Sequence, residues 1–481
     1  MLVASAFGNG LGYLLGIVLA RLLGAEDFGL YAVGMAVFNV LALVSLCGAD
    51  TTVVKFVSEA IQRGDRVLAS RTLVVVLGFV AIAGALASGF LLWSSQTWLL
   101  ELYRRPQLIP VFTILALTIP IVMAVTVFMA SFQAAHAFTQ VVTVRYLWEP
   151  LGKLTLAIAA VWLGWGLVGV VGAIGVTSLI SLALASHSAR TILLPGLTAS
   201  SFDRSIADPL LRYGLPLSVM TIVGVVAPRT DVLLLGYWAD PAQVGLYQAA
   251  YQTAAILTLI AAALDMAFAP LAAGLFASQD LTRLMSLYQT VFRWLLTVSC
   301  PVALVFVVFG SDILSLFGPT FPLAVTCLLL LALGQWINNG TTFAHTLLLM
   351  SGHVRLAMWN TIGTGAMLVT LNWLLIPLWG INGAALAVAF SMGLAGVIRL
   401  GEVWVILGLH PFSMELVKPL CAGLVTIAVG YWTKGLVKPE LLIGVAITTG
   451  LLYLILLYAM KLEESDRLAL AGLRQRMIRP R

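Results

Sequence analysis

The sequence is poor in charge and in cysteine. Only 10% of its 481 residues are charged and 61% are hydrophobic, whereas soluble domains have about 25% charged and roughly 45–50% apolar residues. The four cysteines lie inside apolar stretches at no metal-ligand spacing, so we expect neither disulfides nor a zinc site. No loop is long enough to hold a soluble domain. These absences predict a chain embedded in a bilayer, with no bound metal or cofactor.

Apolar runs of membrane-spanning length recur along the whole chain. A helix needs about 20 mostly apolar residues to cross the hydrocarbon core, and fourteen runs approach or exceed that length. They cover residues 2–23, 29–50, 72–94, 108–132, 141–163, 166–189, 212–238, 242–268, 289–310, 322–350, 356–376, 380–400, 415–433 and 440–460. The sequence therefore predicts an all-α polytopic membrane protein with about 14 transmembrane helices.

Short motifs recur at a nearly constant spacing. Gly29–Tyr31 returns as Gly245–Tyr247, 216 positions later, and Trp165–Gly169 is matched by Trp379–Gly383 at an offset of 214. An ordered set of such matches predicts two similar halves of six spans each. Because six is even, both halves enter the membrane from the same side, as in parallel-repeat transporters.

The repeat defines a predicted domain organisation. An N-terminal six-helix repeat covers residues 1–195 and a second six-helix repeat covers residues 208–405. Two additional transmembrane helices follow within residues 412–462, and a basic tail occupies residues 463–481.

Basic residues distinguish the two sides of the membrane. Loops and tail on one side carry 18 Lys and Arg residues, Arg399 among them, and the opposite side carries 5. The positive-inside rule then places both termini in the cytoplasm. The net charge of +6 reflects this topology and attraction to anionic membrane lipids, and not nucleic-acid binding. We expect a multi-pass protein of the cell (cytoplasmic) membrane.

Several repeated residues have a structural interpretation. Asp50, Asp65 and Asp280 lie where a carboxylate can accept from free backbone N–H groups at a helix start, so we interpret them as N-caps. Gly29 and Gly245 open two spans after short loops and are expected to allow a close helix contact or a tight turn.

The span 141–163 contains three charged residues, although a charge at the bilayer centre costs about 2.5–3.5 kcal/mol. Arg145, Glu149 and Lys153 are spaced by four, which places them on one helical face with Glu149 able to pair in either direction. Pro150 can kink the helix at this point and free a backbone carbonyl. The row either binds a substrate or forms structural ion pairs.

Further polar candidates lie in later spans. Arg229 and Asp231 are two residues apart and so are poorly placed to neutralise each other. Together with the row in span 141–163 they make a slightly cationic lumen, suited to an anionic passenger such as a phosphate. Structural pairing, with Arg229 reaching the outer interface, is the alternative. Asn338 and Asn339 can bind sugar hydroxyls or join neighbouring helices.

The stretches Arg21–Tyr31, Pro228–Gly236 and Val244–Tyr247 resemble the polysaccharide transporter, or oligosaccharide flippase, family. That family belongs to the multidrug/oligosaccharidyl-lipid/polysaccharide exporter superfamily. The resemblance implies two six-helix bundles around a central cavity, and an activity that moves lipid-linked oligosaccharides from the inner to the outer leaflet. It supplies no coupling residue that this sequence matches.

We therefore expect a transporter, not an enzyme, that flips polyprenyl-pyrophosphate oligosaccharides by alternating access for cell-surface polysaccharide biosynthesis, such as O-antigen export. Its expected partners are the lipid-linked oligosaccharide and membrane lipids, with a glycan polymerase and glycosyltransferases as further candidates. One alternative is a cation-coupled multidrug or lipid-II exporter of the same superfamily. Another is a membrane glycan polymerase or glycosyltransferase, which usually needs paired acids or a large extramembrane loop.

Overall fold

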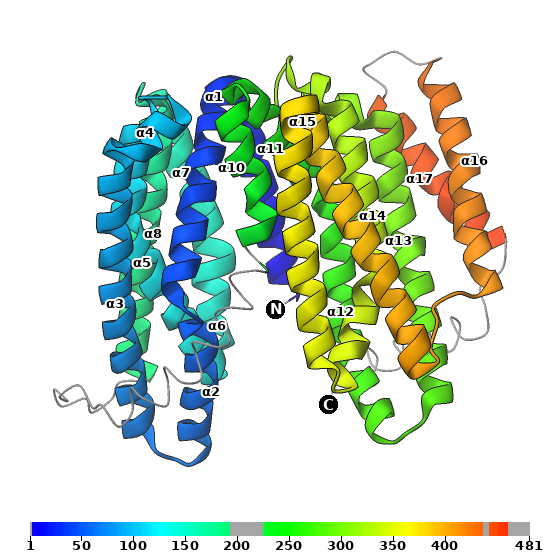
Figure 1. The fold of residues 1–481 in the computed structure, drawn as a ribbon, viewed down its shortest axis with the longest axis horizontal. Coiled ribbons are helices and arrows are strands. Elements are labelled where there is room, and N and C mark those ends of the chain that lie inside the picture. Colours follow the sequence, from blue (N-terminus) through cyan, green and yellow to red (C-terminus); the bar gives the residue numbers. More distant parts are fainter. Residues whose placement is uncertain (1, 193–223, 225, 436–441, 460–481) are drawn as a thin grey trace. The chain divides into compact units, whose positions relative to one another are not determined.

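The structure of the chain is a computed structural model that describes residues 2–192, 224, 226–435 and 442–459. All regular elements in these ranges are helices (Figure 1). The described helices divide into two compact units. Unit 1 comprises residues 1–252, 315–321 and 361–384, and unit 2 comprises the remainder.

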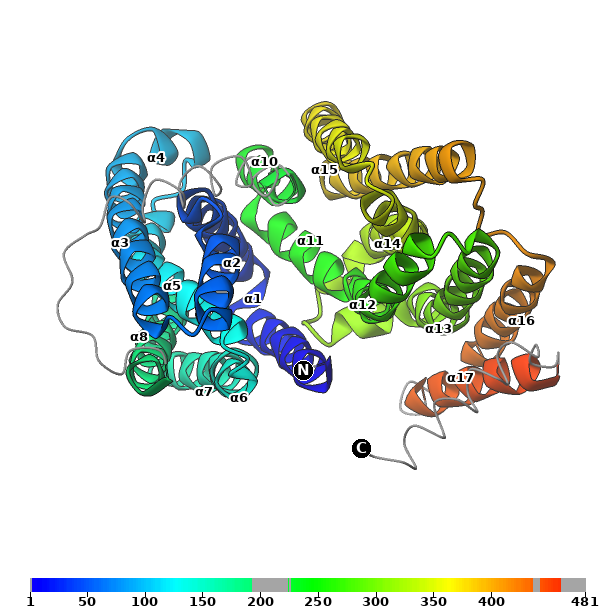
Figure 2. The same ribbon diagram turned by 90° about the horizontal axis from the view of Figure 1, so that it is seen from below.

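Unit 1 contains the helices of the N-terminal half and the first helices of the second half. Their bounds are α1 (Leu2–Leu46), α2 (Ala49–Gln62), α3 (Arg66–Gln96), α4 (Trp98–Tyr103), α5 (Leu108–Ala134), α6 (Phe138–Val141), η1 (Val142–Trp148), α7 (Glu149–Trp162), α8 (Gly166–Ile192), η2 (Ala227–Arg229), α10 (Thr230–Trp238) and, as far as residue 252, α11 (Pro241–Ala254). In Figure 2 these helices are seen nearly end on, with α3, α5, α7 and α8 in one bundle beside α1.

Unit 2 contains most of the later helices. These are α12 (Ile256–Ala277), α13 (Leu281–Ser315), η3 (Phe321–Ala324), α14 (Val325–Met350), α15 (Val354–Leu407), η4 (Met414–Leu416), α16 (Val417–Lys434) and α17 (Leu442–Ala459). The middle of α15, residues 361–384, belongs to unit 1.

Nine helices of the described ranges are long and apolar enough to cross a membrane. Two of them, α1 and α15, each contain two of the fourteen predicted spans, joined across glycines with positive φ: Gly24 at 79° and Gly380 at 54°. The predicted span 141–163 is helical but broken into α6, η1 and α7. The predicted spans 212–238 and 440–460 lie partly outside the described residues. The all-α polytopic fold is confirmed, and the predicted tail 463–481 lies outside the described residues.

The matched Trp-Gly motifs share a backbone conformation. Gly166 has φ 51° and Gly380, its counterpart, has φ 54°. Gly166 is the first residue of α8, and Gly380 lies at a kink inside α15. Glycine permits both conformations because it has no Cβ to clash in the left-handed region.

Two matched aspartates are N-caps, as predicted. The Asp65 carboxylate accepts from the Leu68 N–H at 2.8 Å, and the Asp280 carboxylate accepts from the Arg283 N–H at 3.1 Å. Each side chain satisfies one of the free N–H groups at a helix start. The two turns that lead into α3 and α13 therefore use the same chemistry.

The predicted capping role of Asp50 is wrong. The N-cap of α2 is Gly48, in a left-handed conformation with φ 69°, and no side chain caps the helix. Asp50 lies in the first turn, where its only described hydrogen bond is from the Thr51 hydroxyl at 3.5 Å. Its negative charge still favours the positive end of the helix dipole.

Gly29 and Gly245 lie against each other, where α1 crosses α11. A Cβ on Gly29 would overlap the Pro241 carbonyl oxygen, and a Cβ on Gly245 would overlap the Ala25 carbonyl oxygen. The contact is reciprocal. Ala25 and Gly29 on α1 are four residues apart, as are Pro241 and Gly245 on α11, and the repeat offset of 216 relates the two pairs. The predicted close helix contact is confirmed, as small residues allow two backbones to approach within a membrane.

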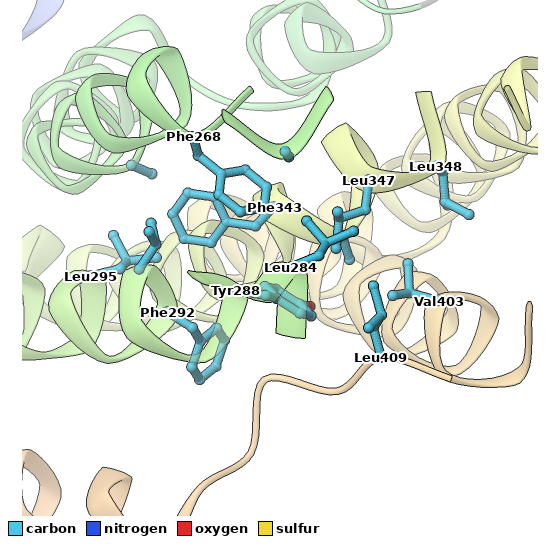
Figure 3. Close-up of a cluster of buried hydrophobic side chains, with 14 of the residues drawn as sticks. Phe268, Leu284, Tyr288, Phe292, Leu295, Phe343, Leu347, Leu348, Val403 and Leu409 are labelled. Atoms are coloured by element: carbon cyan, nitrogen blue, oxygen red, sulfur yellow. The ribbon is translucent and has the colours of Figure 1, made fainter. Parts of the chain in front are cut away.

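Unit 2 is held together by a cluster of rings and branched side chains between α12, α13, α14 and α15 (Figure 3). The ring of Phe268 lies edge-on to that of Phe343, with centroids 5.1 Å apart, and lies 6.3 Å from that of Tyr288. All three side chains are fully buried. Because lipid tails are as apolar as these residues, the stabilisation comes from close van der Waals packing.

Candidate functional site

The charged row of the span 141–163 is arranged as its spacing predicts. Glu149 lies between its two neighbours, 3.6 Å from the Arg145 guanidinium and 3.5 Å from the Lys153 ammonium. The Glu149 side chain is 13% exposed, whereas Arg145 is 47% and Lys153 30% exposed. The carboxylate is thus enclosed by two cations that keep accessible surface.

The backbone carrying this row changes its winding between Arg145 and Glu149. Residues Val142–Trp148 form a π-helix, and α7 begins at Glu149 with Pro150 in its first turn. Proline lacks the N–H that an α-helix would need here, so the preceding carbonyls find other donors. The Trp148 indole also donates to the Thr177 carbonyl on α8 at 3.3 Å. Such π segments occur frequently at functional sites.

Glu149 is the one negative charge in this row and pairs with both Arg145 and Lys153, so the row carries a net charge of +1. In the described part of the chain, neither Arg145 nor Lys153 has a partner besides Glu149. Arginine offers five N–H donors and lysine three, and Glu149 can accept only some of them. The remaining donors can form charge-assisted hydrogen bonds with a phosphate or carboxylate.

Asp231 is buried, with 1% of its surface exposed. Its carboxylate accepts from the Tyr247 hydroxyl and from the Val232 N–H. Arg229 is half-buried and makes no hydrogen bond or ion pair within the described ranges, so the two charges do not pair, as their spacing predicts. In this conformation Asp231 has almost no surface to offer a ligand, although it remains a predicted site residue.

Replacing Tyr247 with phenylalanine is expected to lower the free energy of unfolding by about 1–3 kcal/mol, because a buried carboxylate loses a hydrogen-bond donor. The Tyr247 ring stacks on Tyr251 with centroids 6.3 Å apart, so Tyr251→Phe is a control that keeps the stacking and the Asp231 contact. Thermal unfolding in detergent measures the difference. Equal midpoints for the two variants would contradict the role assigned to the Tyr247 hydroxyl.

The two asparagines lie in unit 2, on α14. The side-chain amide oxygen of Asn338 accepts from the Arg399 guanidinium at 3.4 Å. Asn339 is 1% exposed, and its side-chain amide nitrogen has no partner among the described residues. The count of basic residues placed Arg399 in a loop, but this residue lies in α15, which continues to Leu407. The contact therefore joins α15 to α14.

Four further polar residues of unit 2 were not among the site residues predicted from the sequence. The Asn360 amide donates to the Glu402 carboxylate at 2.5 Å, and the Asp265 carboxylate accepts from the Thr346 hydroxyl at 2.7 Å. The sequence does indicate Asp265 as a polar site, because a carboxylate inside an apolar stretch needs a partner. Nothing in the sequence indicates the pairing of Asn360 with Glu402, since 42 positions separate them.

Comparisons with known proteins agree with this architecture. A family model described as "Polysaccharide biosynthesis protein" matches residues 1–276, and the MatE model matches residues 216–374. The probable low-salt glycan biosynthesis flippase Agl15 of Haloferax volcanii is 23% identical over 417 residues, which are 83% of this chain and 81% of Agl15. The probable flippase AglR of the same organism is 25% identical over 199 residues, 40% of each chain.

Solved transporter structures share the fold. The lipid II flippase MurJ in an inward closed conformation has a TM-score of 0.76 at 13% identity, covering 94% of this chain and 97% of MurJ. An inward-facing multidrug resistance MATE family transporter has a TM-score of 0.68 at 14% identity, covering 88% and 96%. Taken together, the two family models, the flippase relatives and this fold define a multi-pass membrane transporter of the multidrug/oligosaccharidyl-lipid/polysaccharide exporter superfamily. More narrowly, the chain belongs to the polysaccharide biosynthesis protein family, whose model covers more than half of it.

Proposed function

We propose that this transporter flips lipid-linked oligosaccharides across the cell membrane for the synthesis of surface polysaccharides. The observation that carries the proposal is the row formed by Arg145, Glu149 and Lys153, which has a net positive charge and two partly exposed cations. A polyprenyl-pyrophosphate carrier presents a compact anion, and the spare donors of this row match it. The flippase relatives Agl15 and AglR support the same substrate class.

Transport proceeds by alternating access of the two six-helix halves, residues 1–195 and 208–405, with both termini in the cytoplasm. Arg145 and Lys153 bind the pyrophosphate, and the half-buried Asn338 forms hydrogen bonds with the glycan. Asn339 is 1% exposed and contacts the glycan only in a conformation that uncovers it. Arg229 and Asp231 become available when α10 moves. The chain acts as a transporter and not as an enzyme, and a glycan polymerase and glycosyltransferases are its candidate partners.

Reconstitution into liposomes tests this function. A fluorescent polyprenyl-pyrophosphate oligosaccharide is placed in both leaflets, and a membrane-impermeant quencher reports which molecules reach the outer leaflet. Purified protein is expected to make nearly all of the label accessible, whereas protein-free liposomes leave the inner-leaflet share protected. Equal protection with and without protein would reject the proposed function.

Lipid II is a second candidate substrate, because the chain shares its fold with a lipid II flippase at a TM-score of 0.76. Both substrates carry a polyprenyl pyrophosphate, so the charged row does not separate them. The same assay with fluorescent lipid II does so. Faster quenching of lipid II than of the oligosaccharide lipid would favour the second candidate.

A further inference from the structure

Unit 1 contains an apolar cavity that the proposed function does not use. Its volume is about 440 Å³, and side chains of α1, α3, α4, α10 and α15 line it. Ligand pockets typically measure roughly 300–1,000 Å³, so the cavity has room for a ligand segment. The lining residues that matter most are Leu41, Phe90, Trp98, Leu234, Tyr237 and Trp373.

The wall of this cavity suits a hydrocarbon and not a sugar. Aromatic rings form much of it, and Trp98, Tyr237 and Trp373 are 44%, 46% and 57% exposed. Ser94 is a polar lining residue, but its hydroxyl already donates to the Leu91 carbonyl at 3.2 Å. A glycan would leave its hydroxyl groups unpaired here, which costs free energy for each of them.

A positively charged residue, Arg104, comes directly after the last cavity-lining residue of α4 in the sequence. Tyr103 lines the cavity and ends α4, and Arg104 comes next in a left-handed conformation with φ 52°. Arg104 is exposed and has no ion-pair partner within the ranges that the structure covers, whereas Arg105 pairs with Asp240 at 3.0 Å. An apolar cavity beside an unpaired cation matches an amphipathic anion, with the chain in the cavity and the charge at the arginine.

We infer that this cavity binds the isoprenoid chain of a polyprenyl phosphate or pyrophosphate, with the phosphate at Arg104. The inference rests on the proposed function, which supplies a substrate with one long branched chain. A single chain fits one cavity, whereas a diacyl phospholipid would leave its second chain outside. The α4 end of unit 1 lies opposite the turn between α2 and α3 (Figure 1). The distribution of basic residues predicts that this turn is in the cytoplasm. The cavity is therefore an outer-leaflet site for the flipped product.

Photo-crosslinking of the full-length protein in liposomes tests the site. A polyprenyl phosphate with a diazirine in its chain is expected to label peptides of α4 and α10. Filling the cavity by Leu234→Trp should reduce this labelling roughly tenfold, equivalent to about 1.4 kcal/mol. Leu86→Trp is the matched control, because Leu86 is 71% exposed on α3 and does not line the cavity.

The charge at Arg104 is tested with a second variant. Arg104→Gln should weaken labelling by the polyprenyl phosphate and leave labelling by the matching uncharged polyprenol unchanged. Glutamine accepts the left-handed backbone about as poorly as arginine does, so the local strain stays similar. Wild-type labelling that maps away from α4 and α10 overturns the inference, as does equal competition by excess phosphatidylglycerol.

The flipping assay in the same liposomes separates this inference from the proposed function. Protein that flips the oligosaccharide lipid without labelling at α4 and α10 overturns the cavity assignment alone. Protein that is labelled there but does not flip the lipid overturns the proposed function and keeps the binding site.

Discussion

Replacing Arg145 and Lys153 together with glutamine is expected to abolish flipping while folded protein remains in the membrane. Each lost charge-assisted hydrogen bond costs about 1.5–3 kcal/mol. Two such losses slow transport roughly a hundredfold to ten-thousandfold, since each 1.36 kcal/mol is a factor of ten. The rate of fluorophore quenching in proteoliposomes measures the effect.

Two companion variants make this result interpretable. The double change leaves Glu149, which is 13% exposed, without its two cations, and an unpaired charge in such a place destabilises the fold. A triple variant that also carries Glu149→Gln has a neutral row and removes this problem. Arg63→Gln with Arg66→Gln removes the same number of charges from exposed positions and should flip normally. Full activity of the triple variant would exclude this row as the pyrophosphate site.

Adding a single methyl group at Gly29 is expected to cost about 3 kcal/mol, the upper end for overpacked interiors. The new Cβ would overlap the Pro241 carbonyl oxygen, and a backbone atom cannot move aside as a flexible side chain can. Gly245→Ala should cost a similar amount through the Ala25 carbonyl oxygen. The loss appears as a lower thermal midpoint and a smaller yield of monodisperse protein.

The reciprocal geometry makes a sharper prediction for the double variant. Either alanine alone forces α1 and α11 apart, so the second alanine meets a contact that is already open. Gly29→Ala with Gly245→Ala should therefore cost clearly less than the sum of the single changes, because the sites are coupled. Gly12→Ala is the control on α1, since a Cβ there has no neighbour within 4 Å. Additive losses would show that the two glycines act independently.

The sequence alone was sufficient for the membrane fold and for the local chemistry of its helices. Spans can be predicted from apolar length, because an unpaired backbone polar group in lipid costs several kcal/mol and so forces helix formation. The row at Arg145, Glu149 and Lys153 followed from the four-residue spacing, which places side chains on one face of any regular helix. The caps at Asp65 and Asp280 followed from the same local rules.

Tertiary structure decided the features that depend on distant neighbours. The contact of Asn338 with Arg399 joins residues 61 positions apart, and only the packing of α14 against α15 brings them together. The cavity beside Trp98 and Leu234 likewise arises where several helices fail to fill the space between them. Helical periodicity sets which residues share a face, but the packing of the helices sets what that face meets.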